Sequence, residues 1–319
     1  MAYGQSGHFA LSFQESFGTL FTGSQFFIPL ISETIGETIE QLVENNMYGR
    51  FAESPYHEGL HEISGEIRAE AHPIYLGAFL KAALGQPVST LVTSVYEHEF
   101  LPAASDWDGS AAVPPATLEV HRDAGSAFVY YDLQATNLSI EIAHGQLLSA
   151  TLGVLGGQFS RKAAASASFL AGRPWTWDVV SAQYNGAGIS EFRQLSVSFE
   201  NQLTPHHTLS ATKTPYRIKR EGPQKVGIEG TFLLNDQALF QEFLDQSEKR
   251  LLVSFQGEAI SGGDYAELIL DIPRMRFAEL APQLSGAGQL EVSFSANAVY
   301  DTTSGYAMRV TLTNTQPAY

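Results

Sequence analysis

The 319-residue chain contains no cysteine. Disulfide bonds, thiolate nucleophiles and cysteine-ligated metal sites are therefore excluded. Charge is also scarce: charged residues make up 16% of the chain, and 18 lysines and arginines against 34 aspartates and glutamates give a formal net charge of −16. Because an acidic chain repels polyanions and offers few cations to phosphates, we do not expect a protein that reads DNA sequence.

Long apolar runs and the common catalytic fingerprints are missing as well. No segment is long and apolar enough to cross a bilayer, and no basic residue precedes Arg50, so we expect a chain that is neither secreted nor membrane-bound. The nucleophile-elbow, phosphate-loop and dinucleotide-binding motifs are absent. We therefore expect no catalytic residue, no cofactor and no metal.

One string matches a zinc-enzyme motif. His57-Glu58-Gly59-Leu60-His61 fits H-E-x-x-H, which binds zinc when a helix places both imidazoles on one face. Gly59 weakens a helix here, and the residues that follow alternate with the period of a strand. We expect a solvated loop that leads into a strand, and an enzyme is the least favoured function.

The dominant pattern in the sequence is the alternation of apolar and polar residues that is typical of β-strands with one buried face. It begins near residue 37 and recurs in segments such as 63–67 and 138–142. One helix is expected at 73–84, because Pro73 can occupy its first position and Gly85 can end it. These patterns predict an α+β fold made mainly of antiparallel sheet.

The order of the predicted elements occurs twice. The strand at 63–67 is echoed at 228–232, and the apolar residues of the helix at 75–80 are echoed at 239–244. Two further pairs of segments match in the same order, which are 43–46 with 199–202 and 145–147 with 288–290. We infer two tandem β-sandwich domains, each with one flanking helix.

Composition suggests where these domains begin and end. Glycine pairs and a run of alanine and serine cluster between residues 156 and 188, a composition that fits a linker or crossover. The predicted division is an N-terminal arm at 1–35, a first domain at 36–157, a linker or crossover at 158–188, a second domain at 189–301 and a C-terminal tail at 302–319.

The N-terminal arm carries a stripe of four phenylalanines spaced four residues apart. This is the spacing of one helical face, although nearby glycines weaken a helix. Two interpretations stay open: the stripe docks on the chain's own core, or the arm is loose in the monomer and buries its rings on a neighbouring subunit. The four residues are Phe9, Phe13, Phe17 and Phe21.

The chain resembles the major tail tube proteins of long-tailed, non-contractile bacteriophages, particularly the larger members with two tube domains in tandem. The resemblance rests on the strand and helix block at 63–84, on the stretch Arg173-Pro174-Trp175-Thr176-Trp177 that leads to 195–203, and on the paired strands at 138–155 and 274–300. It implies a structural virion protein whose subunits form rings. The rings stack into a hollow tube, and β-sandwich domains contribute strands to a barrel that lines the lumen.

The resemblance also implies partners and a location. The subunit would assemble with itself and meet the tape-measure, tail-terminator and baseplate or tail-tip proteins. DNA would pass through the lumen without specific binding, and the protein would be part of the virion tail after assembly in the host cytoplasm. By position, the loops at 46–60 and 204–223 and the terminal segments 1–30 and 302–319 would bridge successive rings.

Three physical properties of the chain favour this implied role. Open antiparallel sheets expose unpaired edges, and closing subunits into a ring removes them. Two repeats per chain would let three subunits form a ring with pseudo-sixfold symmetry; a ring of six full chains is the alternative. The acidic balance predicts an acidic lumen, because like charge keeps phosphate from binding.

The residues expected at contacts between subunits or rings come from the arm and the two loops. Five of the 18 positive charges lie between Lys213 and Lys225, so we expect a basic loop that faces an acidic surface of the adjacent ring. The expected interface residues are Phe9, Phe13, Phe17, Phe21, Tyr48, Arg50, Arg217, Lys219 and Arg220. A related secretion or gene-transfer tube, or a monomeric tandem β-sandwich module that binds carbohydrate or a host surface, remains the alternative.

Overall fold

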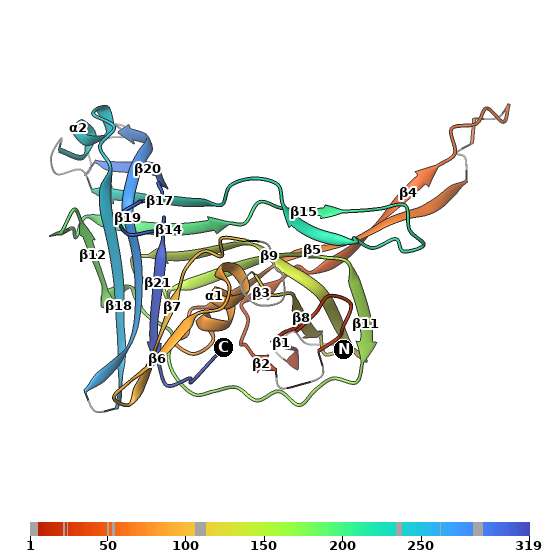
Figure 1. Cartoon of the computed structure of the whole chain (residues 1–319), viewed down its shortest axis with the longest axis horizontal. Helices are drawn as coiled ribbons and strands as arrows, with labels where there is room; N and C mark the ends of the chain where they lie inside the picture. The colour runs from red at the N-terminus through yellow and green to blue at the C-terminus, as the bar shows by residue number, and fades with distance from the viewer. Residues whose placement is uncertain are drawn as a thin grey trace.

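The computed structural model describes residues 6–21, 23, 25–49, 51–52, 55–105, 113–233, 238–261, 263–282 and 290–319. Within these residues the chain is mostly antiparallel β-sheet with two α-helices (Figure 1), which confirms the predicted fold class.

The elements of the first half lie on a red-to-green course in Figure 1. They are β1 (His8–Phe13), β2 (Phe26–Phe27), β3 (Ser32–Glu33), β4 (Gly36–Val43), β5 (Tyr56–Glu70), α1 (Leu76–Leu84), β6 (Val88–Val92), β7 (Val95–Phe100), β8 (Ala116–His121), β9 (Ala127–Ala143), β10 (Ser149–Gly156) and β11 (Gln158–Lys162).

The second half continues from green to blue. Its elements are the 3-10 helix η2 (Trp177–Val179), β12 (Val180–Tyr184), β13 (Ala187–Gly188), β14 (Phe192–Glu200), β15 (Leu203–His206), β16 (Arg217–Arg220), β17 (Lys225–Leu233), α2 (Ala238–Leu244), β18 (Lys249–Ser261), β19 (Asp264–Pro282), β20 (Glu291–Ala298) and β21 (Arg309–Asn314).

One continuous antiparallel sheet runs through both halves. Its strands pair in the order β5, β10, β9, β14, β17, β20 and then β19. The ladder between β9 and β14 joins residues 137–143 to residues 194–200, which lie far apart in the sequence. We call this seven-stranded layer the central sheet.

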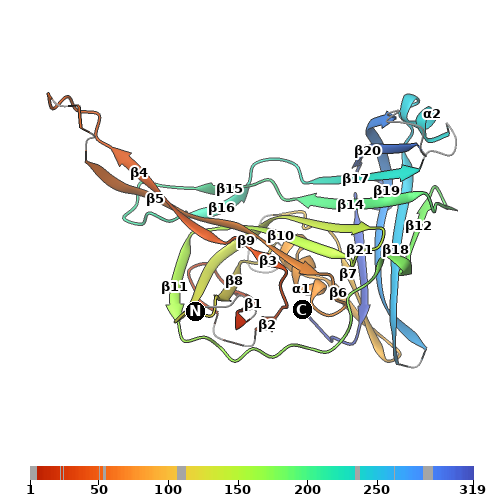
Figure 2. The same ribbon diagram turned by 180° about the vertical axis from the view of Figure 1, so that it is seen from behind.

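Strand β9 belongs to two sheets because it is long enough to bend from one into the other. Its first half pairs with β8 and β11, whereas its second half pairs with β10 and β14. The first group continues through β8 to β1 and β2. The bend packs this smaller sheet beneath one end of the central sheet (Figure 2).

Helix α1 covers the apolar face of the central sheet. Every residue of the helix except Lys81 is buried, and Leu80 packs with Leu138, Ile140, Val197 and Phe199 from β9 and β14. Burial of each such side chain contributes about 1.5–3 kcal/mol. The helix ends at Gly85, as the sequence predicts, where φ is 107° and the N–H donates to the carbonyl of Lys81.

The N-terminal segment forms a strand where the phenylalanine spacing suggested a helix. Strand β1 pairs with β8 over six residues, and its ring Phe9 is completely buried. The reason is that β8, paired with β9 on one side, has a free edge on the other, with which β1 pairs. The resulting hydrogen bonds satisfy backbone groups in a segment whose glycines would make a helix unstable. Phe9 therefore docks on the chain's own core.

The C-terminal segment is likewise part of the body, and not the extended arm expected from the resemblance. Strand β21 pairs with β19 on one side and with β7 on the other, so it ties the second half to the first. The last residue, Tyr319, is buried beside α1. The ladder hydrogen bonds and this aromatic anchor hold the segment down.

Both halves contain a hairpin that is followed by a helix and then by a second hairpin. In the first half these are β4–β5, α1 and β6–β7, and in the second they are β14–β17, α2 and β18–β19. Residues 158–188, the expected linker, contain β11, which pairs with β9, and β12, which pairs with β18. The division into tandem domains and its boundaries stay a prediction. No helix among the described residues is long and apolar enough to span a membrane.

Candidate functional site

The outward face of the central sheet is polar throughout its middle. Strand register aligns residues of β5, β10, β9, β14, β17 and β20 into rows across the sheet, and directly paired residues lie on the same face. Three such rows contain only polar residues and glycine. They are Glu70, Ser149, Glu141, Ser196, Glu229 and Ser295; then Arg68, Thr151, Ser139, Ser198, Gly227 and Asn297; then Glu66, Gly153, Asn137, Glu200 and Lys225.

The row between the first two lies on the opposite face and is apolar. It consists of Ala69, Ala150, Ile140, Val197, Ile228 and Ala296, all of which are buried. The alternation that predicted strands therefore also divides the sheet into a core face and a polar face.

The polar face is acidic and of low relief. Its three rows hold five carboxylates against two cations, and most other positions are serine, threonine, asparagine or glycine. One of the two cations is paired within the face itself: Arg68 donates to the Ser149 hydroxyl at 3.3 Å and lies 3.7 Å from the Glu141 carboxylate. The face thus presents excess negative charge and short side chains.

A long hairpin, β4–β5, projects from one end of this face (Figure 1). Strand β5 is paired with β10 as far as Ile63 and continues to Tyr56, and all eight residues of β4 are exposed. Many of the exposed residues are apolar. These are Ile39, Leu42, Val43, Met47, Tyr48, Phe51, Tyr56 and Leu60.

The H-E-x-x-H string lies on β5 of this hairpin, where a loop was expected. Four residues of a strand span about 13 Å, so His57 and His61 cannot share one metal ion. Each ring instead contacts carboxylates: His57 meets Glu44 at 3.1 Å, and His61 meets Glu37 at 2.8 Å. No group of three metal-binding side chains occurs in the described part of the chain.

A second hairpin lies beside the first. It consists of the two-stranded sheet β15–β16 and the turn between them, and Figures 1 and 2 both show it along the base of β4–β5. The His61 N–H donates to the carbonyl of Lys213 at 2.9 Å, and the Lys213 ammonium lies 2.7 Å from the Glu58 carboxylate. The two hairpins therefore leave the body together.

The structure separates the predicted interface residues of the second hairpin into two groups. Arg217 and Lys219 are exposed, and the Arg217 guanidinium lies 5.0 Å from the Tyr216 ring centroid. Arg220 instead holds the fold together, because its guanidinium donates to both oxygens of Asn201 and to the carbonyl of Ala103.

The first hairpin and the N-terminal segment give a similarly mixed outcome. Tyr48 is exposed near the hairpin tip, and Arg50 lies outside the described residues. Phe13 is partly buried, with the Lys81 ammonium 4.4 Å from its ring centroid, and Phe17 and Phe21 are also partly buried. Their role at an interface stays a prediction.

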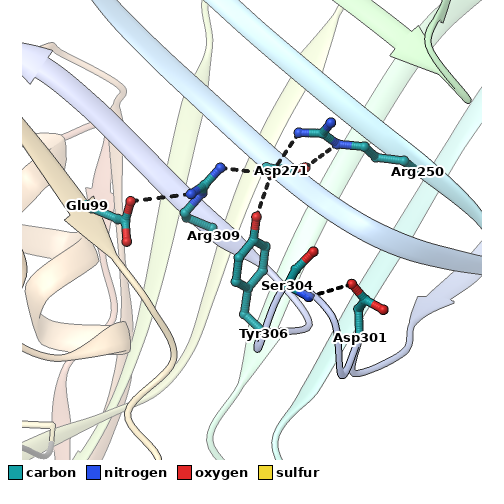
Figure 3. A network of polar contacts seen from close by, with 7 residues as sticks. All are labelled: Glu99, Arg250, Asp271, Asp301, Ser304, Tyr306 and Arg309. Carbon is teal, nitrogen blue, oxygen red and sulfur yellow. Dashed lines mark hydrogen bonds and ion pairs between the residues drawn. The ribbon is translucent and has the colours of Figure 1, made fainter.

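Two buried polar centres were not predicted from the sequence. Asn201 is completely buried and donates from its amide to the carbonyls of Ala83 and Ala135, which fixes the base of the second hairpin against α1 and β9. Asp271 of β19 accepts from Arg250, Arg309 and the Tyr306 hydroxyl (Figure 3). Their only sequence signal was a polar residue within an apolar strand pattern, which does not reveal distant partners.

Raising the pH from 6 to 8 should loosen the structure around His61. Hydrogen bonding to Glu37 raises the pKa of His61; burial opposes this, and Glu58 adds to it. A raised folded-state pKa means that the contribution of His61 is present below its unfolded pKa of about 6.5 and is lost as pH rises through the folded value. Hydrogen exchange at the His61 amide, corrected for the intrinsic rate, should become faster at pH 8.

His61→Gln is the control for this experiment. Glutamine keeps a side-chain donor but does not titrate, so the corrected exchange rate of the variant should be the same at pH 6 and pH 8. An equal pH dependence in both proteins would contradict the role of His61.

Comparison with known proteins agrees with this architecture. No curated protein matches the chain. A family model described as phage tail tube protein matches residues 4–304, which is almost the entire chain. Because the match includes both halves of the central sheet and both hairpins, the chain belongs to the phage tail tube protein family.

Proposed function

We propose that this chain is the major tail tube subunit of a long-tailed, non-contractile phage, and that its copies form stacked rings around a conduit for the genome. The single observation that carries the proposal is the acidic polar face of the central sheet. A conduit with this lining offers few cations to phosphate, so DNA and the tape-measure protein pass without specific binding. In this proposal the polar face is the lumen wall.

Each chain supplies two tube domains, 36–157 and 189–301, to a ring of three chains with pseudo-sixfold symmetry. The support is that a hairpin, a helix and a second hairpin follow in this order in both halves, and that the ladder between β9 and β14 joins the two halves of the wall. Among the described strands, none pairs with the second edge of β19 beyond Met275. Such an edge invites pairing with a sister copy, which closes the ring.

The two hairpins reach from one ring to the next. Strand β5 runs seven residues beyond its last pair with β10, a length of about 23 Å. Apolar side chains exposed in this way mark an interaction surface. Tyr48, Arg217 and Lys219 are the sequence-predicted residues best placed for this contact, whereas Phe9 and Arg220 serve the fold of their own chain.

The proposed role requires neither catalysis nor a cofactor. The tube acts in the virion tail after assembly in the host cytoplasm, and its ends meet the tail-terminator and the baseplate or tail-tip proteins. The role of the subunit is mechanical: it provides a wall and holds adjacent rings together.

Concentrated purified protein should form rings and hollow tubes in negative-stain electron microscopy. Native mass spectrometry of isolated rings should give three times the chain mass of 34.7 kDa. Rings of six times that mass would contradict a ring of three chains but would still agree with the proposed tube. Protein that stays monomeric at high concentration would contradict the tube and favour the monomeric binding module.

A further inference from the structure

An open groove lies at the end of the central sheet away from the hairpins. It has a volume of about 610 Å³ and is bounded by the end of β9, η2, the β12–β13 hairpin and the start of β14. Val180, Ile189 and Phe192 form the apolar part of its lining, and Asp178 and Arg193 also line it. The Trp177 ring is 41% exposed at its rim and packs on the ring of His144 at a centroid distance of 4.4 Å.

Strand register places this groove and the hairpins at opposite ends of the wall. Along β9, Asn137 lies in the polar row nearest the hairpins and Glu141 in the row farthest from them. The strand then continues to Ala143, and His144 follows it into the groove. Figure 1 shows the same polarity, with β12 near one end of the long axis and the β4–β5 tip at the other.

The described residues of the hairpin tip expose apolar side chains. Met47 and Phe51 are fully exposed, and Tyr48 beside them is about half exposed. Exposed apolar residues of this size cost free energy in water, and burial against a partner recovers it. Because the groove of the same chain lies at the far end of the molecule, only another copy can supply it to the tip.

We propose that the β4–β5 tip of one chain inserts Phe51 and Met47 into the groove of a second copy in the adjacent ring. The inference rests on the proposed function, since it names the acceptor for the hairpin that joins rings. A contact between different surfaces at opposite ends is heterologous and propagates in one direction, as stacking requires. Trp177 and His144 at the rim offer edge and face contacts to the incoming phenylalanine.

The absence of native cysteine allows a direct test by cross-linking. Ala52 adjoins the tip and Ser181 lines the groove, and both are exposed. In tubes of the Ala52→Cys/Ser181→Cys variant, oxidation or a short bismaleimide should produce a ladder of covalent dimers, trimers and longer products on non-reducing gels. Each single-cysteine variant should give nothing larger than a dimer, because one cysteine per chain cannot propagate a chain of links.

A second variant tests the apolar contact without cross-linking. Phe51→Ser should shorten tubes at least tenfold at equal protein concentration while ring mass stays unchanged. Leu91→Ser is the matched control, because Leu91 of β6 is also an exposed leucine but belongs to neither hairpin and does not line the groove, and it should leave tube length unchanged.

Different results would contradict the groove as acceptor and the tube itself. Tubes of normal length from Phe51→Ser, together with no ladder from the double cysteine variant, would overturn the groove as acceptor and leave the tube standing. Wild-type protein that never forms tubes would overturn both.

Discussion

Replacing Tyr319 by alanine should lower the free energy of unfolding by about 3–5 kcal/mol, the range for large-to-small changes of buried aromatic residues. The ring is buried among Phe26, His98 and Phe100, with the closest centroid, that of His98, 4.9 Å away. Its hydroxyl donates to the carbonyl of Ile74 at 2.6 Å. The residue therefore closes the contact between the C-terminal segment, α1 and β7.

Neighbouring groups cannot easily move to fill the space that the Tyr319 ring occupies. A methyl group in place of the Gly77 hydrogen on α1 would overlap the ring, so helix and ring are in direct contact. The Lys81 ammonium binds the main-chain oxygen of Tyr319 at 2.6 Å. A cavity at this position would therefore lie between α1 and β21. It could not be filled by movement, because β21 would lose its strand pairing and α1 its packing on the sheet.

Urea denaturation at pH 7 measures this effect, with Tyr319→Phe as the matched variant. Phenylalanine keeps the ring contacts and removes only the hydroxyl, which accepts from the Asn314 amide at 2.7 Å and donates to Ile74. We expect a loss of about 1 kcal/mol for this variant. If Tyr319→Ala lowers the free energy of unfolding no more than Tyr319→Phe does, the Tyr319 ring does not anchor the C-terminal segment.

Replacing Asp271 by asparagine should cost about 3 kcal/mol of stability, at the low end of the range for removing one partner of a buried ion pair. The Asp271 carboxylate is almost completely buried and accepts from Arg250 at 2.7 Å and from Arg309 at 3.2 Å (Figure 3). Asparagine conserves the shape but leaves two guanidinium groups without their shared counter-charge. Both arginines are partly exposed, which limits the loss.

The effect of this substitution should disappear in acid. Burial by itself raises the pKa of Asp271, but hydrogen bonds from Arg250 and Tyr306 and the charges of Arg250 and Arg309 outweigh it and lower the pKa. A lowered folded-state pKa contributes stability that is present above the unfolded value of about 3.9 and is lost as pH falls through the folded value. The difference between wild type and variant should be constant from pH 5 to 8 and shrink below pH 4.

Asp301→Asn is the control, since Asp301 lies in the same region of Figure 3 but its partly exposed carboxylate accepts hydrogen bonds from Ser304 and Thr303 of its own turn. Urea midpoints for the two variants at pH 7 should differ clearly, with Asp301→Asn close to wild type. Equal midpoints would mean that the Asp271 network contributes no specific stability.

The sequence determined the local structure of this protein. Alternation at 63–67 and 138–142 predicted strands with one polar face, and both segments form such strands in β5 and β9. Gly85 ended α1 as predicted, because glycine restricts the backbone only locally, whereas the helix begins at Leu76, three residues after the start predicted at Pro73. Composition alone showed the excess of acidic residues, and the polar face carries part of it; the acidic lumen stays a prediction.

Long-range pairing was beyond the reach of the sequence. Nothing in the phenylalanine spacing showed that β8 would leave an edge for β1, and a four-residue period suits a helix and a short strand alike. The H-E-x-x-H string became part of a strand because β4 supplied a partner for it. The arginines of Asp271 lie 21 and 38 positions away in the chain, a separation at which a polar residue in an apolar pattern has no identifiable partner.

By itself, then, the sequence determined which segments are strands, which face of each is polar and that the chain as a whole is acidic, because these properties depend on neighbouring residues and on sums over the chain. Only the tertiary structure decided that β9 joins β14, that the two hairpins leave the same end of the central sheet and that the groove lies at the other end. The physical reason is that strand ladders have no preferred separation in sequence: register and edge partners are chosen by the packing of the complete core.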